Sequence, residues 1–265
     1  MSKKKIVALA LAVAMLAVVI VGASLAYFSD KTVVAKNTFT VGKVDIKLEE
    51  HVVDENGKKT DDVTETGNND IVDDFGYFLV PGKTVDKDPF VTVIKGSEDC
   101  YVRLKVTLNN ADKFLEIYRT VDGLNLAEAL KFFSYTPAAQ EGATTEPEPV
   151  EGYNTTDWEA VNLDMSAYNE NEKTITVIFN YKNIVEKNAD EDTVLPYLVT
   201  SVKLPEWVTN AQAALFTEGF EVDIVAEAIQ AEGFEATNDK TAMQVAWEAF
   251  DDATVPFGVG APTNP

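Results

Sequence analysis

Few residues of this 265-residue chain have the types and spacing that catalysis requires. His51 is the single histidine, so it alone is available as the base for a serine or cysteine nucleophile. It lies in the segment 49–53, beside an acidic stretch, and we interpret it as a surface or strand-edge residue. The two-histidine motif H-E-x-x-H of helical zinc sites is absent. The sequence therefore predicts no catalytic residues.

Cys100 is the single cysteine, which excludes a disulfide within the chain. A reactive thiol needs positively charged neighbours, whereas Glu98 and Asp99 directly precede this one. An alternating segment begins at the cysteine itself. We therefore predict a small buried residue of a strand and not a nucleophile.

Carboxylates are the most abundant candidate metal ligands, and residues 54–74 are rich in them. The calcium-loop spacing D-x-[DN]-x-[DN]-G is absent there, because Asp54 is followed too closely by Asn56-Gly57. The pair Asn-Gly is typical of a hairpin turn. We predict a solvated, mobile loop over 54–74, with adventitious calcium binding as the alternative. No cofactor is expected, and no metal ligand is assigned.

The N-terminus has the features of a secretory signal peptide. Lysines at positions 3–5 precede an uninterrupted apolar block over 6–21, and small residues follow. Ser24 and Ala26 fit the −3 and −1 positions of a signal peptidase site, so the pattern predicts residues 1–26 as a leader and Tyr27 as the new N-terminus. An uncleaved membrane anchor is the alternative, because the apolar run approaches the length that spans a bilayer.

The chain is strongly acidic, with 22 basic and 44 acidic residues and a net charge of −22. Such a charge repels nucleic acid and anionic membrane surfaces. We therefore expect no nucleic-acid partner, and contact with a membrane only before cleavage. A hydrophobic fraction of 46% is enough for a packed core. We predict one domain over 38–254 and a flexible Pro/Gly-rich tail over 255–265.

Alternation of apolar and polar residues predicts that this domain is built of half-buried β-strands. The clearest case is 101–109, where Val102, Leu104, Val106 and Leu108 share one face. Other segments of this kind are 38–50, 76–80, 90–95, 174–181, 197–204 and 219–231. Strands of this number with turns between them predict a mostly β, antiparallel β-sandwich. The pattern does not separate a jelly roll from an immunoglobulin-like topology.

Helical spacing interrupts the strands in three places. We predict a helical insertion at about 111–133, a short helix over 208–216 and a final helix over 240–250. Asn238 or Asp239 is the expected cap of the final helix. The domain is therefore a sandwich with short helical insertions.

The residues that follow the predicted cleavage site resemble a known family. An aromatic pair and an aspartate come after the cleavage alanine, in Ala26-Tyr27-Phe28-Ser29-Asp30, and the pattern N-T-F-x-x-G-x-x-D-I occupies 37–46. Both segments are similar to the start of TasA/camelysin (CalY) proteins. These are the biofilm-matrix fibre proteins of Gram-positive bacteria, and their export depends on the signal peptidase SipW.

The resemblance implies a jelly-roll fold and a secreted structural protein, not an enzyme, in the extracellular matrix or on the cell surface. It would assemble head to tail with itself, because the freed segment 27–37 would lie across an open sheet edge of the next copy. The expected partners are further copies, a SipW-type signal peptidase during export, and other matrix or cell-wall components. The candidate donor-strand residues are Tyr27, Phe28, Val33, Val34 and Phe39.

Three alternatives remain open at this point. Camelysin-type proteins have been described as metallopeptidases, so a secreted metallopeptidase is one. A monomeric surface adhesin or binding module, with the insertion at 111–133 as its contact surface, is another. The third is that the segment 27–37 is only a disordered terminus.

Overall fold

The computed structural model describes residues 43–65, 80–117, 119–120, 123–124, 130–139, 145, 147–214 and 222–252. These residues belong to one compact unit, Gly42–Pro265. The predicted leader 1–26, the donor segment 27–37 and the tail 255–265 lie outside the described residues. Those three boundaries therefore stay predictions.

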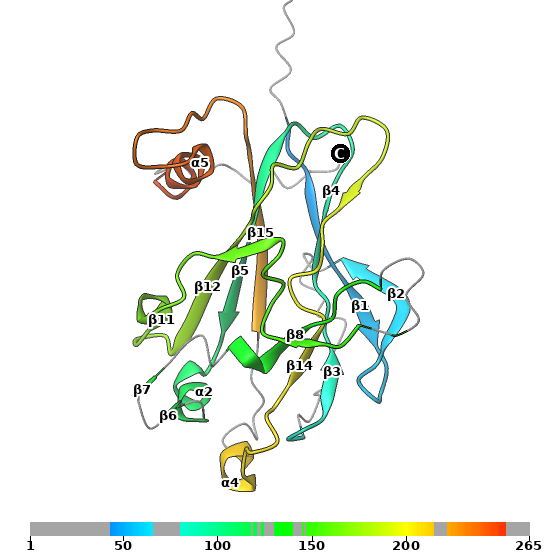
Figure 1. The fold of residues 1–265 in the computed structure, drawn as a ribbon, viewed down its shortest axis with the longest axis vertical. Helices are drawn as coiled ribbons and strands as arrows, with labels where there is room; N and C mark the ends of the chain where they lie inside the picture. The colour runs from blue at the N-terminus through cyan, green and yellow to red at the C-terminus, as the bar shows by residue number, and fades with distance from the viewer. Residues whose placement is uncertain are drawn as a thin grey trace, which may run out of the picture. The chain divides into compact units, whose positions relative to one another are not determined.

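One five-stranded antiparallel sheet forms the first layer of the domain (Figure 1). Its strand order is β10-β12-β5-β15, and β11 also pairs with β12. The strand β5 lies between the two long strands β12 and β15. Its apolar residues alternate without a break, and most of its residues are buried. The bounds are β5 Cys100–Leu108, β10 Trp158–Ala160, β11 Tyr168–Asn169, β12 Thr174–Tyr181 and β15 Val222–Gln230.

Two four-stranded sheets lie on the other side of the core (Figure 1). The first has the order β13-β4-β1-β2, with β1 Ile46–Val53, β2 Lys59–Glu65, β4 Phe90–Val93 and β13 Thr193–Val194. The second has the order β3-β14-β8-β9, with β3 Thr84–Asp86, β8 Phe133–Tyr135, β9 Val150–Glu151 and β14 Ser201–Lys203. All pairings in these sheets are antiparallel.

Short helices and one small hairpin connect the strands. The hairpin pairs β6 Arg119–Thr120 with β7 Gly123–Leu124. The helices are α2 Ala111–Ile117, α4 Asn210–Ala213 and α5 Ala242–Asp251, with 3-10 turns η1 Leu130–Phe132 and η2 Met165–Ala167. The predicted mostly β, antiparallel sandwich with short helical insertions is confirmed.

One apolar core lies between the layers and draws on all three large sheets. Leu104, Phe179 and Trp158 from the five-stranded sheet are almost completely buried, and Val91 and Phe132 meet them from the other side. The indole N–H of Trp158 donates to the backbone carbonyl of Pro196, at 2.9 Å, so the ring is buried without an unpaired donor. The predicted apolar face of 101–109 is therefore the centre of the core.

The predicted loop over 54–74 is wrong at its beginning, where residues 59–65 form the strand β2 and pair with β1. The Asp54 side chain accepts the backbone N–H groups of Asn56 and Lys58, and Gly57 takes a φ of 77°, so a tight turn reverses the chain. The strand β2 lies at a sheet edge and is held by backbone bonds. It therefore needs no apolar alternation, and the pattern did not reveal it.

The predicted helical insertion at 111–133 is correct only in its first part. The helix α2 ends at Ile117, and η1 is a single 3-10 turn that leads into β8. Phe132 and Phe133 are both buried and stack edge to face, with ring centroids 5.3 Å apart. Pairing of Phe133 with Val202 of β14 draws the chain into a strand, and this tertiary contact outweighs the local helical spacing.

The final helix is confirmed, but its predicted cap is wrong. Thr241 is the N-cap of α5, and it forms a reciprocal capping box with Gln244. The strand predicted over 197–204 is also shorter, because only 201–203 pair with neighbouring strands. The strand predicted over 219–231 is confirmed as β15.

Candidate functional site

The residues predicted from sequence for cleavage and assembly all lie outside the described residues. They are the cleavage residues Ser24, Ala26 and Tyr27, and the donor-strand residues Tyr27, Phe28, Val33, Val34 and Phe39. The complementary half of a strand-addition contact, an acceptor edge, has to be sought in the described domain. The strand β15 provides the longest candidate.

The strand β15 is an edge strand nine residues long that pairs with β5 alone among the described strands. Its register with β5 is unbroken from Val222 opposite Leu108 to Gln230 opposite Cys100. In an antiparallel pair, half of the backbone N–H and C=O groups point away from the neighbouring strand. A long edge strand can act as a template for a further strand, and β1 of the facing sheet lies close to this one.

The apolar cover over β15 is incomplete. Ile224, Ala226 and Ala228 face the core but are only partly buried, as is Val222. Their register partners on β5 are at most 4% exposed. An additional chain segment could cover the exposed parts of these four side chains. Each Å2 of apolar surface buried in this way would contribute about 25 cal/mol.

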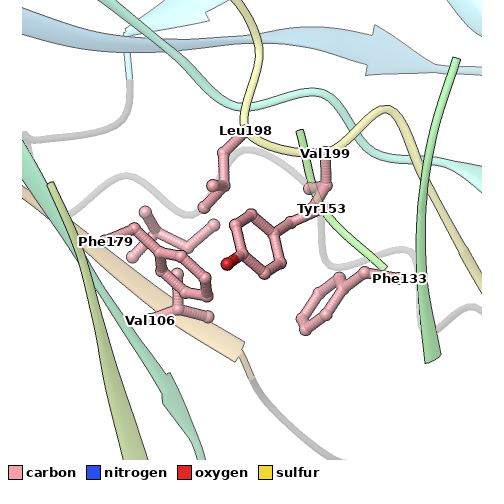
Figure 2. A pocket seen from close by; sticks show the side chains of 7 residues that line it. Val106, Phe133, Tyr153, Phe179, Leu198 and Val199 are labelled. Atoms are coloured by element: carbon pink, nitrogen blue, oxygen red, sulfur yellow. The ribbon is translucent and has the colours of Figure 1, made fainter. Parts of the chain in front are cut away.

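A small, largely enclosed apolar cavity lies beside the same strand (Figure 2). Ile224 of β15, Val106 of β5 and Phe179 of β12 line it from the five-stranded sheet, and Phe133 and Tyr153 bring aromatic rings from the opposite side. Leu198 and Val199 complete the lining. Its described walls carry apolar side chains and the ring of one tyrosine, so the surroundings favour an apolar side chain.

The outer face of the five-stranded sheet is covered at one end by α5. Arg103 of β5 is 2% exposed, and its Nε donates to Glu227 of β15 at 2.6 Å while Nη1 donates to Asp251 of α5 at 2.9 Å. The guanidinium also lies 4.3 Å from the ring centre of Trp247. These contacts fix α5 and the middle of β15 to the same buried cation.

Arg103 is a residue whose importance the sequence did not reveal. The alternation placed it on the polar face of 101–109, where an exposed arginine is ordinary. Trp247 and Phe250, three positions apart on α5, are the one signal that could have indicated a covering helix with an aromatic face. Nothing in the sequence pairs that helix with β5.

His51, predicted as a surface or strand-edge residue, lies on β1 opposite Val63 of β2 and is partly buried, with 19% of its side chain exposed. Its Nδ1 lies 2.9 Å from the carboxylate of Asp88, which is almost completely buried. Lys59 of β2 reaches the same carboxylate at 3.4 Å. No serine, threonine or cysteine nucleophile has a hydrogen bond to His51 among the described residues, and Cys100 is buried as predicted.

The described residues hold no group of three or more His, Cys, Asp and Glu side chains arranged to bind a metal ion. Among the same residues, no helix has the length and apolar character needed to cross a membrane. The tryptophans differ in exposure: Trp158 and Trp247 are buried, and Trp207 is 57% exposed.

The described domain is thus defined as an antiparallel β-protein with a long edge strand and an incompletely covered core beside it. In a comparison with known protein families, residues 2–77 match the family described as camelysin metallo-endopeptidase. This match supports the TasA/camelysin resemblance over the N-terminal part of the chain. No curated protein and no solved structure matches the chain.

Proposed function

We propose that this protein is a secreted structural protein that polymerises by strand addition into extracellular matrix or cell-surface fibres. The segment 27–37 of one copy, followed by Phe39, would pair with the edge of β15 in the next copy. The observation that carries the proposal is the partial burial of Val222, Ile224, Ala226 and Ala228 along an edge that pairs with β5 alone among the described strands.

The chemistry of the two halves is complementary. Extended peptides that add to a sheet edge gain main-chain hydrogen bonds, and alternate side chains fill apolar pockets. The segment offers Tyr27, Phe28, Val33, Val34 and Phe39. The acceptor offers a nine-residue edge and the partly buried side chains of Val222, Ile224, Ala226 and Ala228. A head-to-tail contact of this kind does not close on itself, and it therefore produces filaments.

Export and assembly would be coupled at the Ala26–Tyr27 bond. A SipW-type signal peptidase would release the chain from the membrane and free the aromatic start of the donor segment. Residues 27–265 keep 19 basic and 44 acidic residues after loss of the three leader lysines, and this net charge of −25 would keep the released chains soluble until the edge contact forms. No metal or other cofactor is required by this mechanism.

Removal of the donor segment tests the proposal. A protein that begins at Thr38 should elute as a folded monomer and show no filaments by negative-stain microscopy, whereas the protein that begins at Tyr27 should form them. Added synthetic peptide 27–39 should bind the shortened protein. Filaments formed by the shortened protein under the same conditions would overturn strand addition.

Two neighbouring substitutions on β15 test the acceptor edge. Ala226→Asp places a charge on the half-buried inner side, so assembly should be lost. Val225→Asp places the same charge on the outer side, where Val225 is 52% exposed, so assembly should persist. Circular dichroism of both variants checks that each is folded. Equal assembly of the two variants would exclude β15 as the acceptor.

The description of the matched family as a metallo-endopeptidase supports a second candidate, a secreted metallopeptidase. Peptide cleavage that survives purification and is abolished by a chelator would establish it. Such activity in the Thr38-start protein, which cannot assemble on the first proposal, would separate the two functions.

A further inference from the structure

The carboxylate of Asp88 is buried against two nitrogen-bearing side chains of the β1–β2 hairpin. Asp88 is 1% exposed. Its Oδ2 lies 2.9 Å from Nδ1 of His51 and 3.4 Å from Nζ of Lys59, and its Oδ1 accepts the backbone N–H of His51 at 3.2 Å. An amine, a carboxyl group and an imidazole therefore meet at one oxygen atom.

Two aromatic rings lie beside this cluster. The ring of His51 lies 5.7 Å from that of Phe90 and 6.4 Å from that of Tyr197, centroid to centroid. The Nζ of Lys59 lies 5.7 Å from the centre of the Tyr197 ring. Apolar surroundings disfavour separated charges. Amide formation requires a neutral amine and a neutral carboxylic acid, which transfer of one proton from Nζ to the carboxylate would supply.

We propose that Lys59 and Asp88 form an intramolecular amide bond. The neutral Nζ attacks Cγ of the Asp88 acid, so an Nζ–Cγ bond forms and one Cγ–O bond breaks. The departing oxygen takes up a proton that Nζ loses and leaves as water. Amine and acid thus give amide and water, and the step needs no oxidant, reductant or nucleotide.

His51 is placed to carry the proton between the two reacting groups. Its Nδ1 is buried and lies within reach of Oδ2, yet it has no aligned hydrogen-bond partner among the described residues. An imidazole can accept a proton from the attacking nitrogen and return it to the departing oxygen. The Lys59 side chain is 52% exposed, which leaves a path by which the released water can escape.

The bond would join β2 to the segment between β3 and β4. It would close the chain from position 59 to position 88 and hold the edge hairpin in the sheet. A single cysteine excludes a disulfide within the chain, so an amide is a cross-link that this composition permits. A loop closed in this way restricts the unfolded chain.

The pair Lys58–Asp86 is a natural control. Its Nζ–Oδ1 distance of 3.2 Å is similar, but Lys58 is 62% exposed and Asp86 is 21% exposed. Neither an aromatic ring nor an imidazole is recorded in contact with this pair in the described structure. Proximity alone would link both pairs, whereas a buried carboxyl group with an imidazole beside it would link only Lys59 and Asp88.

Intact mass under denaturing conditions tests the proposal on the purified full chain and, separately, on the form beginning at Tyr27. The protein should be lighter than its sequence by one water molecule, and a protease digest should contain a branched peptide that joins Lys59 to Asp88. Lys59→Arg keeps the charge but should restore the full mass, whereas Lys58→Arg should still lack one water. His51→Gln should leave a larger fraction of the purified protein at the full sequence mass.

The full sequence mass in the parent protein would overturn the amide bond. A missing water that the digest assigns to any other pair of residues would overturn it equally. Because Lys59→Arg retains a cation beside Asp88, its circular dichroism and unfolding midpoint show whether the variant is folded. The measurement does not depend on fibre assembly, so it is independent of the proposed function.

Discussion

Arg103 and Asp251 lie 148 positions apart in the sequence and form a two-point ion pair across the outer face of the five-stranded sheet. The arginine is buried and the aspartate is 53% exposed on its side-chain surface. Trp247 and Phe250 stack against the guanidinium from the same helix. The pair therefore connects a central strand of the domain to the last described helix.

Replacement of Arg103 should destabilise the domain far more than replacement of its neighbour Lys105. Arg103→Ala leaves Glu227 and Asp251 without their cation and removes the surface on which Trp247 packs, so it should cost about 3 kcal/mol of unfolding free energy. Lys105 is 30% exposed and contacts Glu227 at 3.0 Å, so Lys105→Ala should cost about 1 kcal/mol or less. Urea unfolding of both variants measures the difference. Equal losses would contradict the assigned role of Arg103.

The contribution of Asp251 to stability should disappear in acid. Hydrogen bonds from Arg103 lower the pKa of Asp251 below its ordinary value of 3.8. The stabilisation by Asp251 is therefore complete at pH values above its ordinary pKa. It is lost as the pH falls through the lowered pKa of the folded protein. The difference in stability between the parent protein and Asp251→Asn should be constant near neutral pH and should vanish at low pH. Asp252→Asn is the control, and a similar acid-dependent difference there would contradict the assignment.

Cys100 should resist thiol reagents in the folded protein. Burial, followed by the charge of Asp99, raises the pKa of this thiol to about 11, so the reactive thiolate is scarce at pH 8. The side chain is also inaccessible, with an exposure of 0%. Labelling by iodoacetamide should be slow without denaturant and complete in guanidinium chloride. Fast labelling of the native protein would show that the β5 end of the sheet opens.

Truncation at the centre of the core should cost several times more than truncation on the outer face of β15. Leu104 is 0% exposed between the layers, so Leu104→Ala should cost about 2–5 kcal/mol. Val225 is 52% exposed, so Val225→Ala should change stability by about 0.5 kcal/mol or less. Thermal unfolding of both variants provides the comparison. A large loss at Val225 would indicate that this outer face is covered.

Much of the strand framework was predictable because alternation over a long segment depends on local chemistry. The strands β5, β12 and β15 follow directly from segments in which every second residue is apolar. Edge strands such as β2 were missed, because an edge needs backbone partners and little apolar burial. The turn from Phe132 into Phe133 was misassigned, because its conformation depends on pairing with β14.

Sequence by itself determined the antiparallel β class, the buried character of Cys100, the family resemblance at the N-terminus and the absence of the common catalytic motifs. These are properties of residue type and local order. Only the tertiary structure decided that Arg103 is buried beneath α5, that β15 is an edge with a partly uncovered core, and that His51 and Lys59 meet Asp88. Each of these contacts joins side chains from separate segments of the chain. Sheet order and packing bring those segments together. Local periodicity contains no information about which segments become neighbours.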